Sequence, residues 1–207
     1  MTSILKADTI QDTDGNNIIN ESSDTITIGA SGDTTNIVGT LQNNGSALIS
    51  GITMADQWRI TANKSVSSSG SDITANWERI DSTGQGTLGT GMTESSGVFS
   101  FPSTGIYYVA CNVAFSSTSA DSRYIETQIR VTTDNSSYNY VSRLNTSIKH
   151  ISSATYANAS QATLIDVTDT SNVKVMFRVT SADATSKAGN TSHNEGNMFT
   201  FIRLGDT

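Results

Sequence analysis

Few residues of this 207-residue chain have the types and spacing that catalysis or metal binding requires. The two histidines, His150 and His193, have no acidic partner at a motif spacing. The single cysteine, Cys111, excludes an internal disulfide and a zinc site made of cysteines from one chain. Because Cys111 alternates with apolar residues, we expect it to be a small buried hydrophobic side chain rather than a nucleophile.

The carboxylates offer two further kinds of chemistry. Asp12, Asp14 and Asn16 are spaced like the start of a calcium-binding loop, but Asn17 stands where the loop needs glycine and Ser23 where it needs a bidentate glutamate. We expect a turn there instead.

Two carboxylate pairs, Glu78 with Asp81 and Asp166 with Asp169, could serve glycoside hydrolysis if folding set each pair about 5–10 Å apart. Sequence spacing does not establish that distance, and solvated turns are the simpler interpretation. We therefore predict no catalytic residue, no metal and no cofactor, so the protein is expected not to be an enzyme.

The composition indicates an all-β protein. Thr, Ser and Asn number 30, 31 and 17, whereas charged residues make up only 15% of the chain. Threonine favours strands, and serine and asparagine compete with helical hydrogen bonds. The net charge of −7 argues against a nucleic-acid partner. No apolar stretch is long enough to span a membrane, and the first residues lack the pattern of a secretion signal, so we expect synthesis in a cytoplasm.

The chain changes character near residue 57. Residues 1–57 contain no aromatic residue and hold seven acidic residues against one basic residue. Short β-prone pieces alternate there with glycine and asparagine turns, a pattern that cannot bury a core alone but suits a fibre shaft built from several chains. We therefore predict two parts, an extended β-rich segment over residues 1–57 and a head over residues 58–207.

The head is predicted to be an antiparallel sandwich with one buried face per strand. The expected strands are Trp58–Thr61, Asn76–Ile80, Gly97–Phe101, Gly105–Ser116, Arg123–Thr133, Tyr138–Leu144, Ala162–Val167, Asn172–Thr180 and Asn197–Leu204. The polar loops 63–76 and 181–196 are expected on the surface, where such loops often serve recognition.

Two of these strands have apolar residues on both faces, which a single sandwich cannot cover. We therefore expect another subunit of the same chain to cover the second face. The predicted interface residues are Tyr138, Tyr140, Leu144, Phe199 and Phe201.

The stretch Gly97-Val98-Phe99-Ser100-Phe101-Pro102-Ser103-Thr104-Gly105-Ile106-Tyr107-Tyr108-Val109 resembles the signature of complement globular heads and of the wider tumour-necrosis-factor-like jelly roll. The only proline, Pro102, lies at the turn between the two strands, and Phe199-Thr200-Phe201-Ile202 resembles the closing aromatic strand. The resemblance covers about residues 75–204. It implies a jelly-roll head that assembles as a trimer.

Residues 1–57 resemble the leaders and fibre-shaft pieces of virion proteins of tailed phages, through Ser3-Ile4-Leu5-Lys6-Ala7-Asp8-Thr9-Ile10 and Asn16-Asn17-Ile18-Ile19-Asn20. The resemblance implies a structural virion protein, a trimeric short fibre or spike located in the virion. The predicted anchor to other virion proteins of the tail or capsid comprises Ile4, Leu5, Ile10, Ile18 and Ile19.

On this interpretation, the head faces a host surface glycan or protein. The alternatives are a capsid decoration or cement protein, a small polysaccharide-cleaving tailspike, and a secreted signalling head.

Overall fold

The computed structural model describes residues 9–11, 13, 17–22, 25–28, 31–39, 41–43, 46–47, 51–183, 185–189 and 196–207. The chain divides into two compact units, Met1–Ser50 and Gly51–Thr207. The second unit begins earlier than residue 58, the start that the sequence suggested. Strand β6 (Met54–Ile60) is part of the head, and Met54 and Asp56 are buried in it. Among the described residues, no helix is long and apolar enough to cross a membrane.

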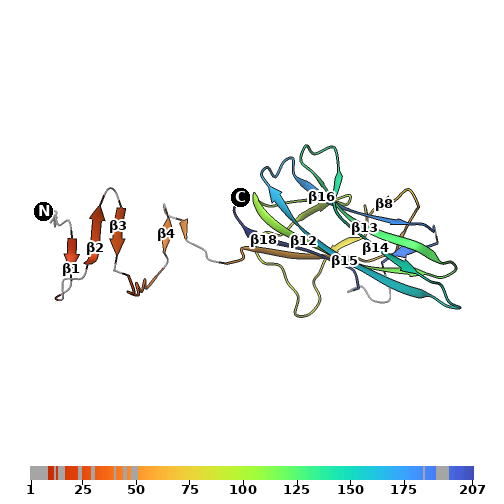
Figure 1. Ribbon diagram of the computed structural model, residues 1–207, viewed down its shortest axis with the longest axis horizontal. Helices are drawn as coiled ribbons and strands as arrows, with labels where there is room; N and C mark the ends of the chain where they lie inside the picture. Colours follow the sequence, from red (N-terminus) through yellow and green to blue (C-terminus); the bar gives the residue numbers. More distant parts are fainter. Residues whose placement is uncertain are drawn as a thin grey trace. The chain divides into compact units, whose positions relative to one another are not determined.

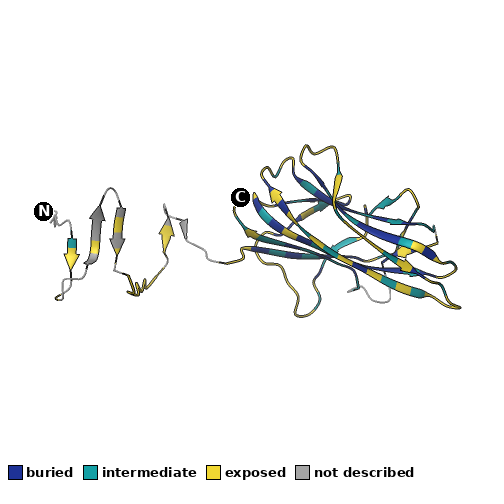
Figure 2. Cartoon of the chain, viewed as in Figure 1, coloured by how far each residue is buried: buried dark blue, intermediate teal, exposed yellow. Residues whose placement is uncertain are grey.

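The first unit contains a three-stranded antiparallel sheet, β1 (Thr9–Gln11), β2 (Asn17–Ser22) and β3 (Thr25–Ile28), and a pair formed by β4 (Gln42–Asn43) and β5 (Ser46–Ala47). Ile10, Ile19 and Ile28 are paired across the three strands. They are 39%, 37% and 55% exposed, so these three isoleucines are not part of a buried core in the described residues of this sheet (Figure 2). The predicted anchor residues Ile4 and Leu5 lie outside the described residues, as does the side chain of Ile18.

The head is the predicted jelly-roll sandwich of two antiparallel sheets (Figure 1). One sheet has the order β10-β11-β16-β13-β14, with β8 paired to β16, and the other has the order β7-β17-β12-β18-β6-β9, with β15 paired to β12. The remaining strands are β7 (Lys64–Ser65), β8 (Ser71–Asp72), β9 (Trp77–Arg79), β10 (Thr93–Ser95), β11 (Val98–Ser100), β12 (Gly105–Ser117), β13 (Ser122–Thr132), β14 (Asn139–Ile148), β15 (Thr155–Val167), β16 (Lys174–Ser181), β17 (Lys187–Ala188) and β18 (Met198–Gly205).

Aromatic rings from both sheets fill the space between them. Phe199 lies 4.6 Å from Phe177 and 4.5 Å from Trp77 between ring centroids, and Phe201 lies 5.1 Å from Phe99. Phe199 and Phe201 are fully buried within one chain. The prediction that they form the trimer interface is therefore wrong: these large side chains supply core volume, and the opposite face of β18 is the one left for a partner.

The turn between β11 and β12 is built as its sequence suggests. Pro102 lies in the turn, and the ring of Tyr107 packs against the ring of Phe101, with 4.7 Å between the ring centroids. The hydroxyl of Tyr107 donates to the backbone oxygen of Ser103 at 2.9 Å. The ring contact and the hydrogen bond hold the start of β12 against the core.

A buried carboxylate ties β6 to the glycine-rich loop that follows β9. The side chain of Asp56 is fully buried and forms an ion pair with Arg79 at 3.0 Å. It also accepts hydrogen bonds from Trp58 Nε1 at 2.9 Å, from the backbone N–H of Met92 at 2.7 Å and from the hydroxyl of Thr87 at 3.3 Å. Asp56 therefore fixes a loop that has few apolar residues of its own.

Candidate functional site

The residues that could carry catalysis have structural roles. Cys111 is buried on the core face of β12, and its burial raises the pKa of the thiol to about 12. The thiol is therefore protonated and unreactive at neutral pH. His193 lies outside the described residues, and His150 lies in the loop after β14, where its backbone N–H donates to Asp121 at 2.6 Å.

Three of the four carboxylates in the two pairs are likewise engaged in local structure, and Asp166 is exposed on β15. Arg59 forms ion pairs with Glu78 at 2.7 Å and with Asp81 at 3.4 Å, so both carboxylates of this pair are held by one guanidinium. Asp169 accepts hydrogen bonds from the backbone N–H of Ser171 at 2.7 Å and from the Asn172 amide at 2.6 Å, which closes the turn before β16.

No calcium-binding arrangement is seen in the described part of the chain. Asp12, Asp14 and Asn16 fall outside it. Within it, no group of three or more His, Cys, Asp or Glu side chains is placed to hold a metal ion.

The strongest candidate for a functional surface is the outward face of the sheet that contains β12. Leu164 of β15 pairs with Tyr108 of β12, and Tyr108 pairs with Ile202 of β18, so the three side chains form one row across three strands. Leu164 is 62% exposed and Tyr108 is 37% exposed. The neighbouring row consists of the small residues Ala162, Ala110 and Thr200. We call this surface, the two rows together, the assembly face.

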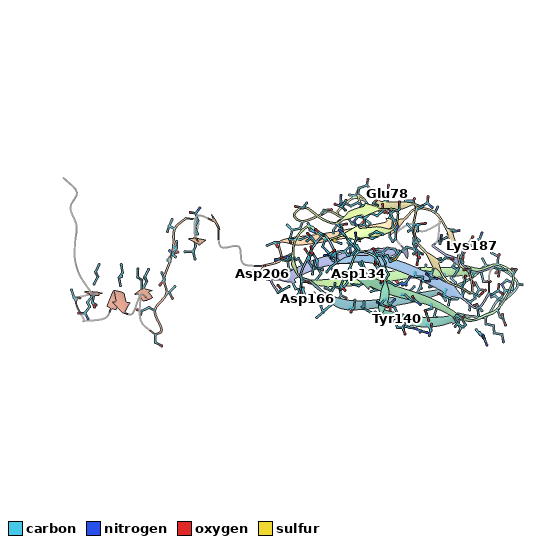
Figure 3. The ribbon with its side chains drawn as sticks, turned by 90° about the horizontal axis from the view of Figure 1, so that it is seen from above. Glu78, Asp134, Tyr140, Asp166, Lys187 and Asp206 are labelled. Carbon is cyan, nitrogen blue, oxygen red and sulfur yellow. The ribbon has the colours of Figure 1, made fainter. Side chains whose placement is uncertain are left out.

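A second apolar region lies along strands β14 and β15, which are the last strands of their sheets on one side of the sandwich. Tyr140 and Leu144 of β14 are 56% and 40% exposed, and Tyr156 of β15 is 57% exposed. Ser142 donates to Gln161 across the two edges at 2.8 Å. Figure 3 shows Tyr140 and Glu78 on opposite sides of the head.

Of the residues predicted for the trimer interface, Tyr140 and Leu144 are exposed on this edge and Tyr138 is half-buried beside it. Their contact with another subunit stays a prediction. The sequence reasoning did not single out Tyr108, Tyr156 or Leu164. The period-two pattern of the two strands could have identified them, because each of these residues alternates with inward-facing residues on a long strand.

The head is similar to known proteins in sequence profile and in fold. The profile of the TNF (Tumour Necrosis Factor) family matches residues 75–194, more than half of the chain. Crystal structures of murine APRIL at pH 8.0 and at pH 5.0 superpose with TM-scores of 0.53, at 13% and 12% sequence identity. Each superposition covers 73% of this chain and 98% of that chain, and at this identity the likeness concerns the fold. The sequence matches no curated protein.

Proposed function

We propose that this chain, which belongs to the TNF (Tumour Necrosis Factor) family, for which homotrimers are characteristic, is a trimeric structural protein of a tailed-phage virion. The resemblance of residues 1–57 to the leaders and fibre-shaft pieces of phage virion proteins supports the virion role. In this proposal the jelly-roll head is displayed for attachment to the host surface. The N-terminal segment docks on the particle. TNF-family members are non-enzymatic signalling ligands, and in this proposal the head binds the host surface without catalysing a reaction.

The assembly face supports the trimer. Its apolar row, in which Leu164 and Tyr108 are exposed and Ile202 is half-buried, presents hydrophobic surface that a second copy would cover. Leu164, Tyr108 and Ile202 supply the apolar row, and the small residues Ala162 and Ala110 beside it permit close approach.

The single observation that carries the proposal is the division of the chain into a head with its own core and a first unit in which no residue of described burial is buried. The described isoleucines of the first unit are exposed, and residues 1–50 hold six acidic residues against one basic residue. Such a segment gains burial by binding other chains, and its charge favours a docking surface rich in basic or backbone N–H groups.

A comparison of two chains tests this proposal. Full-length protein and a fragment of residues 51–207 are each supplied during particle assembly, and purified particles are then labelled with an antibody to the head. We expect the full chain on particles and the fragment absent from them, although the fragment is soluble, β-rich and trimeric. Equal incorporation of both chains, or no labelling with either, contradicts the proposed anchor. Labelling of the tail would indicate a fibre, whereas labelling of the capsid would indicate a decoration protein.

The family match supports a second candidate, a ligand that binds a protein receptor on cells as a signalling molecule. Binding of the fluorescent head to receptor-bearing cells, with no labelling of phage particles, would favour this candidate over the virion protein.

A further inference from the structure

A polar recess of about 390 Å³ lies on the outward face of the sheet that contains β13, β14 and β16. Its volume is at the small end of the ~300–1,000 Å³ typical of ligand sites, so a ligand of one or two rings would fill it. The assembly face belongs to the other sheet of the sandwich. The recess and the assembly face are therefore separate surfaces of the head.

Strand register brings the lining residues together. Thr180, Glu126 and Asn145 are paired across β16, β13 and β14 and form one row. Two residues along each strand, Arg178, Gln128 and Arg143 form the next row on the same face. Six polar side chains thus lie side by side on a surface built from three strands.

The charges of the recess are arranged around a buried carboxylate. Only 6% of the Glu126 side chain is exposed, and its Oε2 pairs with Arg143 at 2.8 Å. The amide of Gln128 donates to its other oxygen. Arg178 pairs with Asp72 at 3.1 Å, and Arg130 shares the same carboxylate at 3.4 Å. The lining itself holds Arg143 and Arg178 against Glu126, and Arg130 and Asp72 lie next to it as a further ion pair. The recess therefore has a surplus of one positive charge in a head whose residues 51–207 hold 11 basic and 13 acidic residues.

Several hydrogen-bonding groups of the recess remain available to a ligand. Arg143 presents five N–H donors and uses one of them on Glu126, while its side chain is 48% exposed. Asn145 and Thr180 add an amide and a hydroxyl that can each donate and accept, and Tyr124 adds an aromatic ring at the margin. Ser69, from the polar loop 63–76, completes the wall.

We propose that this recess binds a sugar ring that carries one carboxylate group. A guanidinium fork matches a carboxylate, and the surplus positive charge suits one negative charge. Ring hydroxyls both donate and accept, as do Asn145 and Thr180, while the aliphatic face of the ring can pack on Tyr124. The buried Glu126 disfavours a more strongly charged phosphate. The inference rests on the proposed function, in that it names the class of host glycan that the head would contact.

Calorimetric titration of the full-length chain tests the inference. The probes are glucuronic, galacturonic and N-acetylneuraminic acids, with glucose and galactose as neutral counterparts of the first two and inorganic phosphate as a plain anion. We expect at least one acidic sugar to bind about tenfold or more tightly than its neutral counterpart and than phosphate, as a charge-assisted bond requires.

Two conservative variants locate the site. Asn145→Ala and Thr180→Val each remove one hydrogen-bonding group from the recess, and each is expected to weaken binding about fivefold. Asn139→Ala, on the same strand but outside the lining, should leave affinity unchanged, and circular dichroism checks that all three fold alike.

Several results would overturn the inference. They are absence of binding by every acidic sugar at millimolar concentration, equal binding of neutral sugars, equal binding of phosphate, and an unaltered affinity in both recess variants. None of these results alters the particle-labelling outcome. Conversely, a chain that binds an acidic sugar but is absent from particles contradicts the virion role alone.

Discussion

Replacing Asp56 with asparagine should destabilise the head more than any comparable surface change. The two carboxylate oxygens accept from Trp58, Arg79, Thr87 and Met92, and the side chain has no exposure to solvent. An asparagine of the same shape carries no charge and offers one acceptor oxygen. The ion pair with Arg79 is therefore lost, and the amide N–H faces either Trp58 Nε1 and the Met92 N–H or Arg79 Nε and the Thr87 hydroxyl. A hydrogen bond to a charged group contributes about 1.5–3 kcal/mol, so losing one or two of them, in part exposed, should cost about 2–4 kcal/mol.

Urea unfolding of the full-length chain, followed by tryptophan fluorescence, measures this loss. With a slope of about 2 kcal/mol per molar urea, the midpoint should fall by about 1–2 M. Protomer concentration is held constant, because assembly contributes to apparent stability. Asp81→Asn is the matched control, since that carboxylate is 79% exposed and 3.4 Å from Arg59 and its loss should cost below about 1 kcal/mol. Equal midpoints for the two variants would refute the structural role assigned to Asp56.

Three other perturbations have defined outcomes. Cys111→Ala should lower the free energy of unfolding by about 1 kcal/mol, because it leaves a small cavity. Burial raises the pKa of the native thiol to about 12, so the thiol should resist thiol reagents at pH 8 until urea exposes it. Reaction of the thiol in the native state would contradict its burial. Hydrogen bonds from the backbone N–H of Ser137, the hydroxyl of Thr132 and the backbone N–H of Ser136 hold the pKa of Asp134 well below its usual range, so its stabilisation is present above about pH 4 and fades as the pH falls through the folded-state pKa. The melting temperature of Asp134→Asn should therefore lie below that of the unaltered chain at pH 6, with a smaller difference at pH 3; a constant difference would argue against this titration. Leu164→Asp places a charge on the assembly face, where 62% of the Leu164 side chain is exposed in one chain. Light scattering should then give the mass of a folded monomer, whereas Ser153→Asp, in an exposed loop, should leave the mass unchanged.

Period-two alternation was enough to predict most of the head. The expected Gly105–Ser116 strand corresponds to β12 (Gly105–Ser117), and the expected Asn197–Leu204 strand to β18 (Met198–Gly205), because their inward residues are large and apolar. The first half of β15 was missed. Its stretch from Thr155 to Gln161 is made largely of small and polar residues, and its strand conformation comes from pairing with β12.

The candidate surfaces were harder to predict, because they depend on contacts between distant strands. Alternation showed that β18 has two apolar faces, but it could not tell which face the opposite sheet covers, and so Phe199 and Phe201 were assigned to the wrong side. The recess needs the register of Glu126 with Asn145 and with Thr180, which no local pattern encodes. The role of Asp56 was hidden as well, since a boundary at residue 57 placed it outside the head.

The mass of the full-length chain in solution tests the central claim, a trimeric head, most directly. Light scattering at micromolar concentration and neutral pH should give three times the 21.9 kDa of one chain. The apolar row of Leu164, Tyr108 and Ile202 is then covered by neighbouring copies. A mass of one chain would contradict both the trimer and the function assigned to the assembly face.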